Sequence, residues 1–457
     1  MLMMKLSRSF FFSLFTAAVV FAPAVLRAQR ETQAARQNVS EAHVSAEDLH
    51  RAVAPQVKDL TIDENRLRTH VMRPQHIIGV ISDRGREEGK LEFVPKKGIF
   101  GPRVAHHLDV DAFTKALHAA LKDQVAGYAM RLRQHGQTIE TLEWQWAQTP
   151  QDGSEGWNPD RLMHVASVSK LITAMAMTKL LNEKNISYDA KIINYLPTYW
   201  AKGSNIDKIT FRNLMTHTSG FTSDTDFESM KAAVAAGVST DPNAADHVGH
   251  YHYENMNFGL CRILIPVING NIAKGANFFP PPLTFLNDQL WDAITIGGYN
   301  QYVQNKVFAP AGVTTATLDH PGAGVLAYKF PVSTAGWNSG SLESVSGGAG
   351  WHLSVDQLLG VMGTFRRGGS IMSPTAAQTM LDNGFGIDLV GVSTPAGKLY
   401  NKNGLWHDAS VNGRTEQSLA YFLPEDMELV VLANSPIGNP EQFFRNVVTQ
   451  IYVDNIK

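Results

Sequence analysis

Ser167 and Lys170 together have the side-chain types needed to attack a carbonyl carbon. They are three positions apart, a spacing that places two side chains next to each other on one face of a helix. The segment from Ser167 to Met177 is otherwise largely apolar, so we expect a buried helix in which Lys170 is desolvated. Desolvation lowers the pKa of an ammonium group, and a neutral amine can accept the proton of a serine hydroxyl. The pattern predicts Ser167 as a nucleophile and Lys170 as its base.

The N-terminus of this helix would favour the same chemistry. Backbone N–H groups beside Ser167 would stabilise an oxyanion as it develops. A serine and a lysine at this spacing are also common on protein surfaces, where they have no catalytic role. Two further motifs therefore decide between the interpretations.

The second motif is Tyr253-Glu254-Asn255. A tyrosine beside the nucleophile can relay a proton between serine, lysine and leaving group. The Asn255 amide can hold both Lys170 and the substrate carbonyl group. Taken alone, the motif would equally fit a loop tyrosine followed by a helix-capping asparagine.

The third motif is Lys402-Asn403-Gly404, followed by Leu405, on a predicted strand. Gly404 would let a substrate lie close to the backbone. Lys402 would supply a positive charge for an anionic substrate group, and the Leu405 N–H would complete an oxyanion hole. The simpler alternative is an exposed Asn-Gly turn.

In combination the motifs resemble those of the serine β-lactamase, D-alanyl-D-alanine peptidase and esterase superfamily, nearest its class C β-lactamase branch. The resemblance covers about residues 108–457, with the motifs in the family's order. The segments that carry it are His164–Lys170, Leu214–Phe221, Tyr253–Asn255, Gly347–Gly350, Phe422–Glu425 and Val430–Asn434.

This resemblance implies roles for individual residues. Ser167 would form an acyl-enzyme, and Lys170 and Tyr253 would share the acid–base chemistry. Asn255 would orient the substrate and Lys170. Lys402 would occupy the third-motif position, whereas we interpret the family hallmark His217 as structural.

The sequence departs from the family's pattern at Glu254 and Asn403. Glu254 replaces a residue that is usually small, and its carboxylate could point outward or disfavour anionic β-lactams. Asn403 replaces the Thr or Ser whose hydroxyl helps β-lactamases and peptidases to bind a substrate carboxylate. The changes favour an ester or amide substrate. Since the spacing from Lys402 to the next strand is long, His407 is a lesser candidate for this site.

A competing interpretation is a zinc site in the loop before Tyr253. Asp246, His247, His250 and His252 lie close together in an order that could bind zinc. The resemblance gives no support for a metal there, and the alternative is that the histidines are simply solvated. We therefore predict no metal site.

The predicted fold is α+β: an antiparallel sheet flanked by N- and C-terminal helices, with an inserted all-helical subdomain. The pattern indicates a helix over 109–123 and a strand pair at 128–132 and 139–146. A second strand pair is expected at 417–423 and 427–433, followed by a helix that opens with Asn439-Pro440. The sheet would thus be built from both ends of the domain.

Residues 1–28 follow the order of a secretory signal peptide. Lys5 and Arg8 precede an apolar run over 9–21, and cleavage would follow Ala24 or Ala28. The run is shorter than the roughly 20 apolar residues of a membrane span. We therefore expect export to the periplasm or the extracellular space, with no stable membrane span after cleavage, rather than an uncleaved anchor.

Two further regions follow the leader. Residues 29–107 are interpreted as a linker and a small extension of unknown role, with strands expected at 76–81 and 91–94. Residues 108–457 would form the hydrolase domain.

The composition narrows the classes of partner. A formal net charge of -2 without a basic tract disfavours a nucleic-acid partner. Cys261 is the only cysteine of the chain, which excludes an internal disulfide. We expect a small-molecule or peptide-like acyl substrate and no cofactor, while the sequence does not indicate an oligomeric state.

The leading hypothesis is an exported serine hydrolase that cleaves an ester or amide. A β-lactamase or D-alanyl-D-alanine carboxypeptidase would use the same site. The alternative from another class is a non-catalytic binding protein on this scaffold, which gives no reason to keep all of the catalytic residue types.

Overall fold

The computed structural model describes most of the chain after the predicted leader. The predicted signal peptide, the strand expected at 91–94 and the Asn439-Pro440 helix start lie outside the described residues. The described residues are 45–61, 63–72, 80–81, 106–280, 286–408, 413–437 and 444–457.

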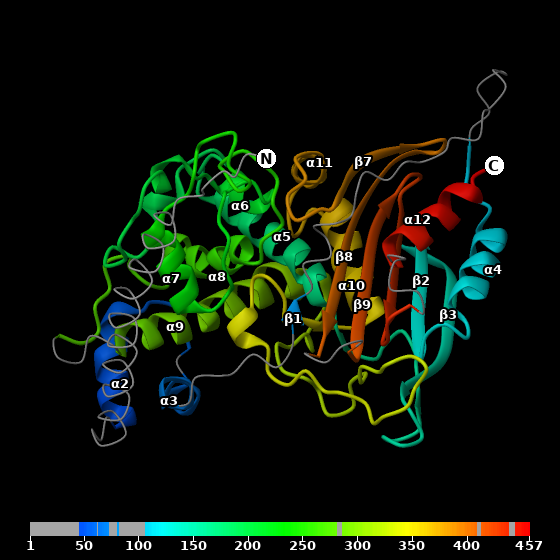
Figure 1. Cartoon of the computed structure of the whole chain (residues 1–457), viewed down its shortest axis with the longest axis horizontal. Helices are drawn as coiled ribbons and strands as arrows, with labels where there is room; N and C mark the ends of the chain where they lie inside the picture. Colours follow the sequence, from blue (N-terminus) through cyan, green and yellow to red (C-terminus); the bar gives the residue numbers. More distant parts are fainter. Residues whose placement is uncertain are drawn as a thin grey trace, which may run out of the picture.

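An eight-stranded antiparallel sheet forms one half of the molecule (Figure 1). Its order is β1-β8-β9-β10-β2-β3-β4, and β7 pairs with β8 outside this order. Strands from the start and the end of the main domain lie side by side, so the predicted α+β fold is confirmed. The bounds are β1 (Val80–Ile81), β2 (Gly127–Gln134), β3 (Gln137–Gln148), β4 (Glu155–Gly156), β7 (Leu389–Thr394), β8 (Gly397–His407), β9 (Thr415–Leu423) and β10 (Met427–Ala433). A separate pair is β5 (Met163–His164) with β6 (His352–Leu353).

Two helices from opposite ends of the domain cover one face of the sheet (Figure 1). They are α4 (Val110–Leu121) and α12 (Phe444–Asp454). Asp109 caps the first of them, as its side chain accepts from a backbone N–H of the first turn. The two helices meet where the rings of Phe113 and Tyr452 pack edge to face, with centroids 6.4 Å apart. The expected pairing of terminal helices is therefore present.

The other face of the sheet carries the helical subdomain, in which α5 is buried along almost its whole length. Its apolar side chains join one large core with those of the surrounding helices. Among the described residues, no helix has both the length and the apolar character required to cross a bilayer. The helices are α5 (Ser169–Glu183), α6 (Phe211–Met215), α7 (Phe227–Ala236), α8 (Met256–Asn269), α9 (Leu286–Val303), α10 (Val355–Gly363) and α11 (Pro374–Asp382).

Two short helices that precede the main domain pack on this subdomain. They are α2 (Ala46–Val53) and α3 (Glu64–Met72). Leu49 and Val53 of α2 and Leu67 of α3 are buried in the core that contains α5 and α8. The extension is thus a component of the hydrophobic core.

Polar contacts tie the same extension to segments near the centre of the molecule. His70 Nε2 lies 3.0 Å from Asp292 Oδ2 on α9, and Arg66 Nε donates to Glu343 Oε2 at 3.2 Å. Glu343 precedes the Gly347–Gly348 pair by a few residues. The extension therefore contacts the segment that leads to these two glycines.

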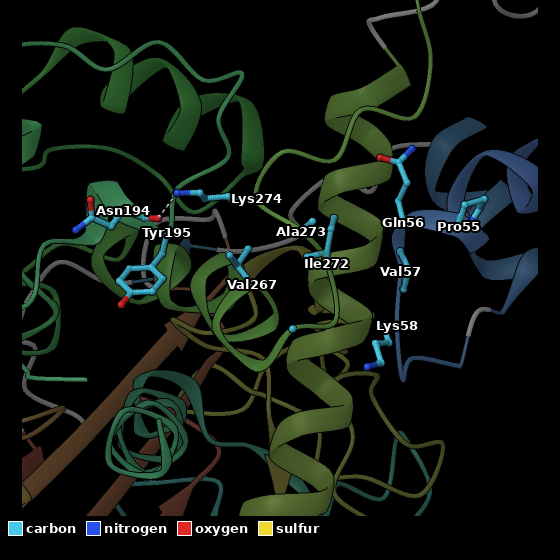
Figure 2. A pocket seen from close by; sticks show the side chains of 11 residues that line it. Pro55, Gln56, Val57, Lys58, Asn194, Tyr195, Val267, Ile272, Ala273 and Lys274 are labelled. Carbon is cyan, nitrogen blue, oxygen red and sulfur yellow. Dashed lines mark hydrogen bonds between the residues drawn. The ribbon is translucent and has the colours of Figure 1, made fainter. Parts of the chain in front are cut away.

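The extension also borders a surface pocket of about 540 Å³ (Figure 2). Pro55, Gln56, Val57 and Lys58 line one side of it, and Tyr195 lies on the other. The extension thus shapes the surface of the subdomain as well as its core.

Replacing Leu49 with alanine should lower the free energy of unfolding by about 2–5 kcal/mol, because it leaves a cavity in the shared core. The measurement is urea unfolding followed by circular dichroism. Arg51→Ala is the control on the same helix, since the Arg51 side chain is 71% exposed. Equal effects of the two substitutions would contradict the contribution of α2 to the core.

Candidate active site

Ser167 lies in a tight turn between β5 and α5. The turn is a 3₁₀ helix, Ala166–Val168, and the regular helix begins two residues after Ser167. The expectation that the helix starts at Ser167 is therefore wrong, because a short 3₁₀ turn precedes the regular helix. Ala166 has a φ of 46°, in the left-handed region that non-glycine residues rarely adopt. This backbone presents Ser167 at the entrance of the helix.

Residues that are distant in the sequence fix the turn in place. The N–H of Val165 donates to the Trp351 carbonyl at 2.9 Å. Its own carbonyl accepts from Ser418 Oγ of β9 at 2.6 Å. The position of Ser167 is therefore set by the sheet as well as by α5.

A buried histidine–glutamate pair lies beneath the same turn. His164 Nε2 accepts from the Gly350 N–H at 3.1 Å, which places the imidazole proton on Nδ1, 3.1 Å from Glu416 Oε2. Burial lowers the pKa of His164 to about 3 and raises the pKa of Glu416 to about 8. The two groups are therefore uncharged together at neutral pH.

Lys170 is completely buried one helical turn from Ser167. Its Nζ lies 3.0 Å from Ser167 Oγ, 2.8 Å from Asn255 Oδ1 and 2.8 Å from the Gly348 carbonyl oxygen. Asn255 is the N-cap residue of α8, but its side chain makes no capping hydrogen bond. Its amide is bound to Lys170 instead.

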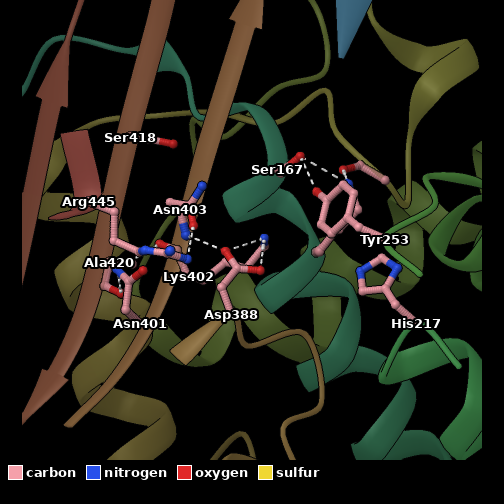
Figure 3. A network of polar contacts seen from close by, with 12 residues as sticks. Ser167, His217, Tyr253, Asp388, Asn401, Lys402, Asn403, Ser418, Ala420 and Arg445 are labelled. Atoms are coloured by element: carbon pink, nitrogen blue, oxygen red, sulfur yellow. Dashed lines mark hydrogen bonds and ion pairs between the residues drawn. The ribbon is translucent and has the colours of Figure 1, made fainter. Parts of the chain in front are cut away.

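Tyr253 closes the group on the side of the nucleophile (Figure 3). Its hydroxyl donates to Ser167 Oγ at 2.8 Å. The ring centroid lies 5.0 Å from Lys170 Nζ and 5.2 Å from Lys402 Nζ. The phenol thus contacts Ser167 and lies close to two lysine side chains, in a position to transfer a proton.

The third motif lies on β8, which passes directly beside the nucleophile turn. A Cβ at Gly404 would come within 2.5 Å of the Val165 carbonyl oxygen and 2.9 Å of the Ser167 nitrogen, so only glycine fits. The N–H of Asn403 points away from β9, and alternate residues of a strand present their N–H groups to the same side. Leu405 therefore directs its N–H to that side too, next to Ser167.

Two charged residues of this site were not predicted from the sequence, Asp388 and Arg445 (Figure 3). Asp388 binds Lys402 through both carboxylate oxygens, each 2.8 Å from Nζ. Arg445 Nη1 donates to Asn403 Oδ1 at 3.4 Å. The hairpin turn around Gly397 was the signal that could have placed Asp388, since it sets the register of β7 on β8.

His217 supports Tyr253 from behind. The two rings are stacked, with centroids 4.4 Å apart, and His217 Nδ1 accepts from the Glu254 N–H at 3.2 Å. Burial, together with the charges of Lys170 and Lys402, lowers the pKa of His217 well below its usual value. A neutral ring in this position agrees with a structural role.

Glu254 does not point outward into solvent. Its side chain is 14% exposed, and its Oε1 lies 3.5 Å from His252 Nε2. His252 also contacts Asp246 through Nδ1. The unusual carboxylate of the second motif is therefore part of a charged cluster next to Tyr253.

The remaining candidate residues are the histidines of the loop before Tyr253 and His407 at the end of β8. The rings of His247 and His250 stack on each other with centroids 5.1 Å apart. No group of three His, Cys, Asp or Glu side chains is arranged to hold a metal ion among the described residues. His407 ends β8 on the strand face opposite Gly404, and its Nδ1 lies 2.6 Å from the Asp408 carbonyl oxygen.

Comparisons with known proteins agree with this architecture. Residues 110–271 match the model of the Beta-lactamase family. A Bacillus subtilis protein described as a penicillin-binding protein, PbpX, is 24% identical over 166 residues, which cover 35% of this chain and 33% of that protein. The chain thus matches about a third of the length of this relative. The family match supports serine hydrolase chemistry through an acyl-enzyme in general.

Solved structures extend the likeness to most of the chain. FmtA from Staphylococcus aureus has a TM-score of 0.55 at 15% identity, covering 79% of this chain and 92% of its own. A class C beta-lactamase from Rhodobacter sphaeroides gives 0.52 at 18%, with 75% and 99% covered. A D-amino acid amidase from Ochrobactrum anthropi gives 0.52 at 17%, with 76% and 97% covered. The resemblance to the serine β-lactamase and penicillin-binding protein superfamily is confirmed, and at these identities the structures show the shared fold.

The buried Glu416 should make stability depend on pH. Its pKa rises from 4.5 to about 8 on folding, so between these values only the folded chain holds the proton. The contribution of Glu416 to stability must therefore fall as pH rises through this range and level off above about pH 8. Glu416→Gln should remove this fall, which amounts to a few kcal/mol at about 1.4 kcal/mol for each pKa unit.

Urea unfolding at pH values from 6.5 to 9 measures the effect, and the exposed Glu143→Gln on β3 is the control. An identical pH dependence in Glu416→Gln and the unmodified chain would rule out the neutral buried carboxyl group.

Proposed function

We propose that this chain is an exported serine hydrolase that cleaves an ester or an amide through an acyl-enzyme on Ser167. One observation carries the proposal: Ser167 Oγ lies 3.0 Å from Lys170 Nζ and 2.8 Å from the Tyr253 hydroxyl, inside a buried cluster. These distances are within hydrogen-bond reach for proton transfer. Export is proposed from the leader sequence.

The acceptors around Lys170 suit it to act as a base. A neutral amine has two N–H bonds and one lone pair. The carbonyl oxygens of Asn255 and Gly348 can only accept, so they would take both N–H bonds. The lone pair is then directed at Ser167, whose hydroxyl proton it can remove as the oxygen attacks the carbonyl carbon.

The later steps follow from the same geometry. The N–H groups of Ser167 and Leu405 would hold the oxyanion of the tetrahedral intermediate. Tyr253 would pass a proton to the leaving group, since its hydroxyl is bound to Ser167 Oγ. Water would then attack the acyl-enzyme by the reverse route and release the acid. The residues provide this chemistry without a cofactor.

A second candidate is a β-lactamase or D-alanyl-D-alanine carboxypeptidase using the same acyl-enzyme. The class C beta-lactamase and D-amino acid amidase with this fold give it support as a class of chemistry. Against it stands Asn403, which lacks the hydroxyl expected at the third motif. A non-catalytic binding protein would leave the contacts of Lys170 and Tyr253 with Ser167 without a purpose.

Ser167→Ala should abolish hydrolysis of 4-nitrophenyl esters, because it removes the oxygen that would form the acyl-enzyme. Mass spectrometry should show one fluorophosphonate adduct on the unmodified chain and none on the variant. Ser370→Ala, at an exposed serine, is the control and should keep both activities. Full ester turnover by Ser167→Ala would refute the nucleophile, and failure of the unmodified chain to react with any probe would favour a binding protein.

A further inference from the structure

We infer that Asp388 determines which substrate charge the enzyme prefers. The site would accept acyl groups that carry no anionic group near the scissile carbonyl. This inference rests on the proposed function, and it identifies the class of ester or amide that the site takes. Asp388 is a specificity-determining residue here, because it acts through Lys402 and the β8 backbone.

The carboxylate of Asp388 occupies the groups that would otherwise bind an anion. It lies 2.8 Å from Lys402 Nζ through each of its oxygens. One of the same oxygens accepts from the Asn403 N–H at 2.9 Å. The cation of the third motif and the adjacent strand N–H are thus both bound to a carboxylate of the chain itself.

The backbone holds this carboxylate in place. The Asp388 N–H donates to the Asn401 carbonyl at 2.8 Å, and the next residue begins the pairing of β7 with β8. The Lys402 side chain is 1% exposed and that of Asp388 is 11% exposed, so water screens the pair weakly. The ion pair is therefore a fixed part of the strand edge and not a mobile surface contact.

This arrangement disfavours a second carboxylate for two reasons. The negative charge of Asp388 repels another anion near Lys402, and the repulsion is strong where water is excluded. A substrate carboxylate would also have to displace Asp388, which would leave a buried charge without its partner. An uncharged acyl group meets neither penalty.

The other ionisable side chains around the site also have partners within the protein. Arg445 reaches Asn403 from α12, which covers the face of the sheet opposite to α5 (Figure 1). Lys170 is bound to oxygens of Ser167, Asn255 and Gly348. On the other side, Glu254 adds a further carboxylate next to Tyr253. The Lys402 cation is therefore paired with a carboxylate, and Glu254 places a second carboxylate in the motif of Tyr253.

The test compares two esters that share the same glutaryl chain: mono(4-nitrophenyl) glutarate, which is anionic, and its methyl ester, which is neutral. The unmodified enzyme should show at least tenfold higher kcat/KM for the neutral ester. Asp388→Asn should reduce that ratio at least tenfold, because Lys402 can then bind the anion. Asp388→Glu should keep the neutral preference, and the exposed Asp207→Asn is the matched control.

Several results would overturn the inference. They are equal or faster hydrolysis of the anionic ester by the unmodified enzyme, and an unchanged ratio in Asp388→Asn. If that variant does not fold, as judged by circular dichroism, the ratio of the unmodified enzyme decides alone. Absence of both turnover and fluorophosphonate labelling of Ser167 would instead refute the proposed function, and the inference with it.

Discussion

The amine of Lys170 must lie away from water and still have partners for its hydrogens, and the rest of the structure provides for this. Its acceptors come from three separate segments: the turn of Ser167, the start of α8 at Asn255 and the loop at Gly348. A polar group buried without partners is destabilising by several kcal/mol. The helical subdomain around α5 excludes water, and the loops between its helices supply the oxygens. Packing and chemistry therefore depend on one another here.

Two lysines lie on either side of Tyr253 at nearly the same distance from its ring, yet their surroundings differ. Lys170 lies within hydrogen-bond distance of three uncharged oxygens, which can accept from either protonation state of the amine. Lys402 contacts both oxygens of the Asp388 carboxylate. The first lysine is thereby placed to exchange a proton with Ser167, whereas the second is held by Asp388 beside the phenol. The division follows from the partners and not from the residue type.

The sequence was most informative where the signal is local. The spacing of apolar residues predicted α4, and the alternation of apolar and polar residues predicted β2 and β3. Both patterns arise from residues that are neighbours in the sequence. Ser167 and Lys170 were recognisable since one helical turn relates them. Contacts between distant segments left no such pattern, so Glu416 beside His164 could not be predicted, whereas the hairpin around Gly397 was a local signal for Asp388 that went unused.

Some local details also escaped prediction. The 3₁₀ turn before α5 depends on the left-handed backbone at Ala166. Val165 holds it in place by donating to the Trp351 carbonyl and accepting from Ser418. The orientation of Glu254 depends on His252, whose position is fixed by a loop of irregular conformation. Where tertiary contacts determine the backbone, composition and periodicity carry little information.

The nucleophile turn rests on β8 and β9, which are more than 230 residues further along the chain. A growing polypeptide therefore contains Ser167 and Lys170 long before it contains Gly404 and Ser418. Until those strands are made, the serine has neither its backbone support nor a complete oxyanion hole. If Ser167 is the nucleophile, as proposed, we expect the chain to form no acyl-enzyme during its own synthesis and to become reactive only when its last strands join the sheet.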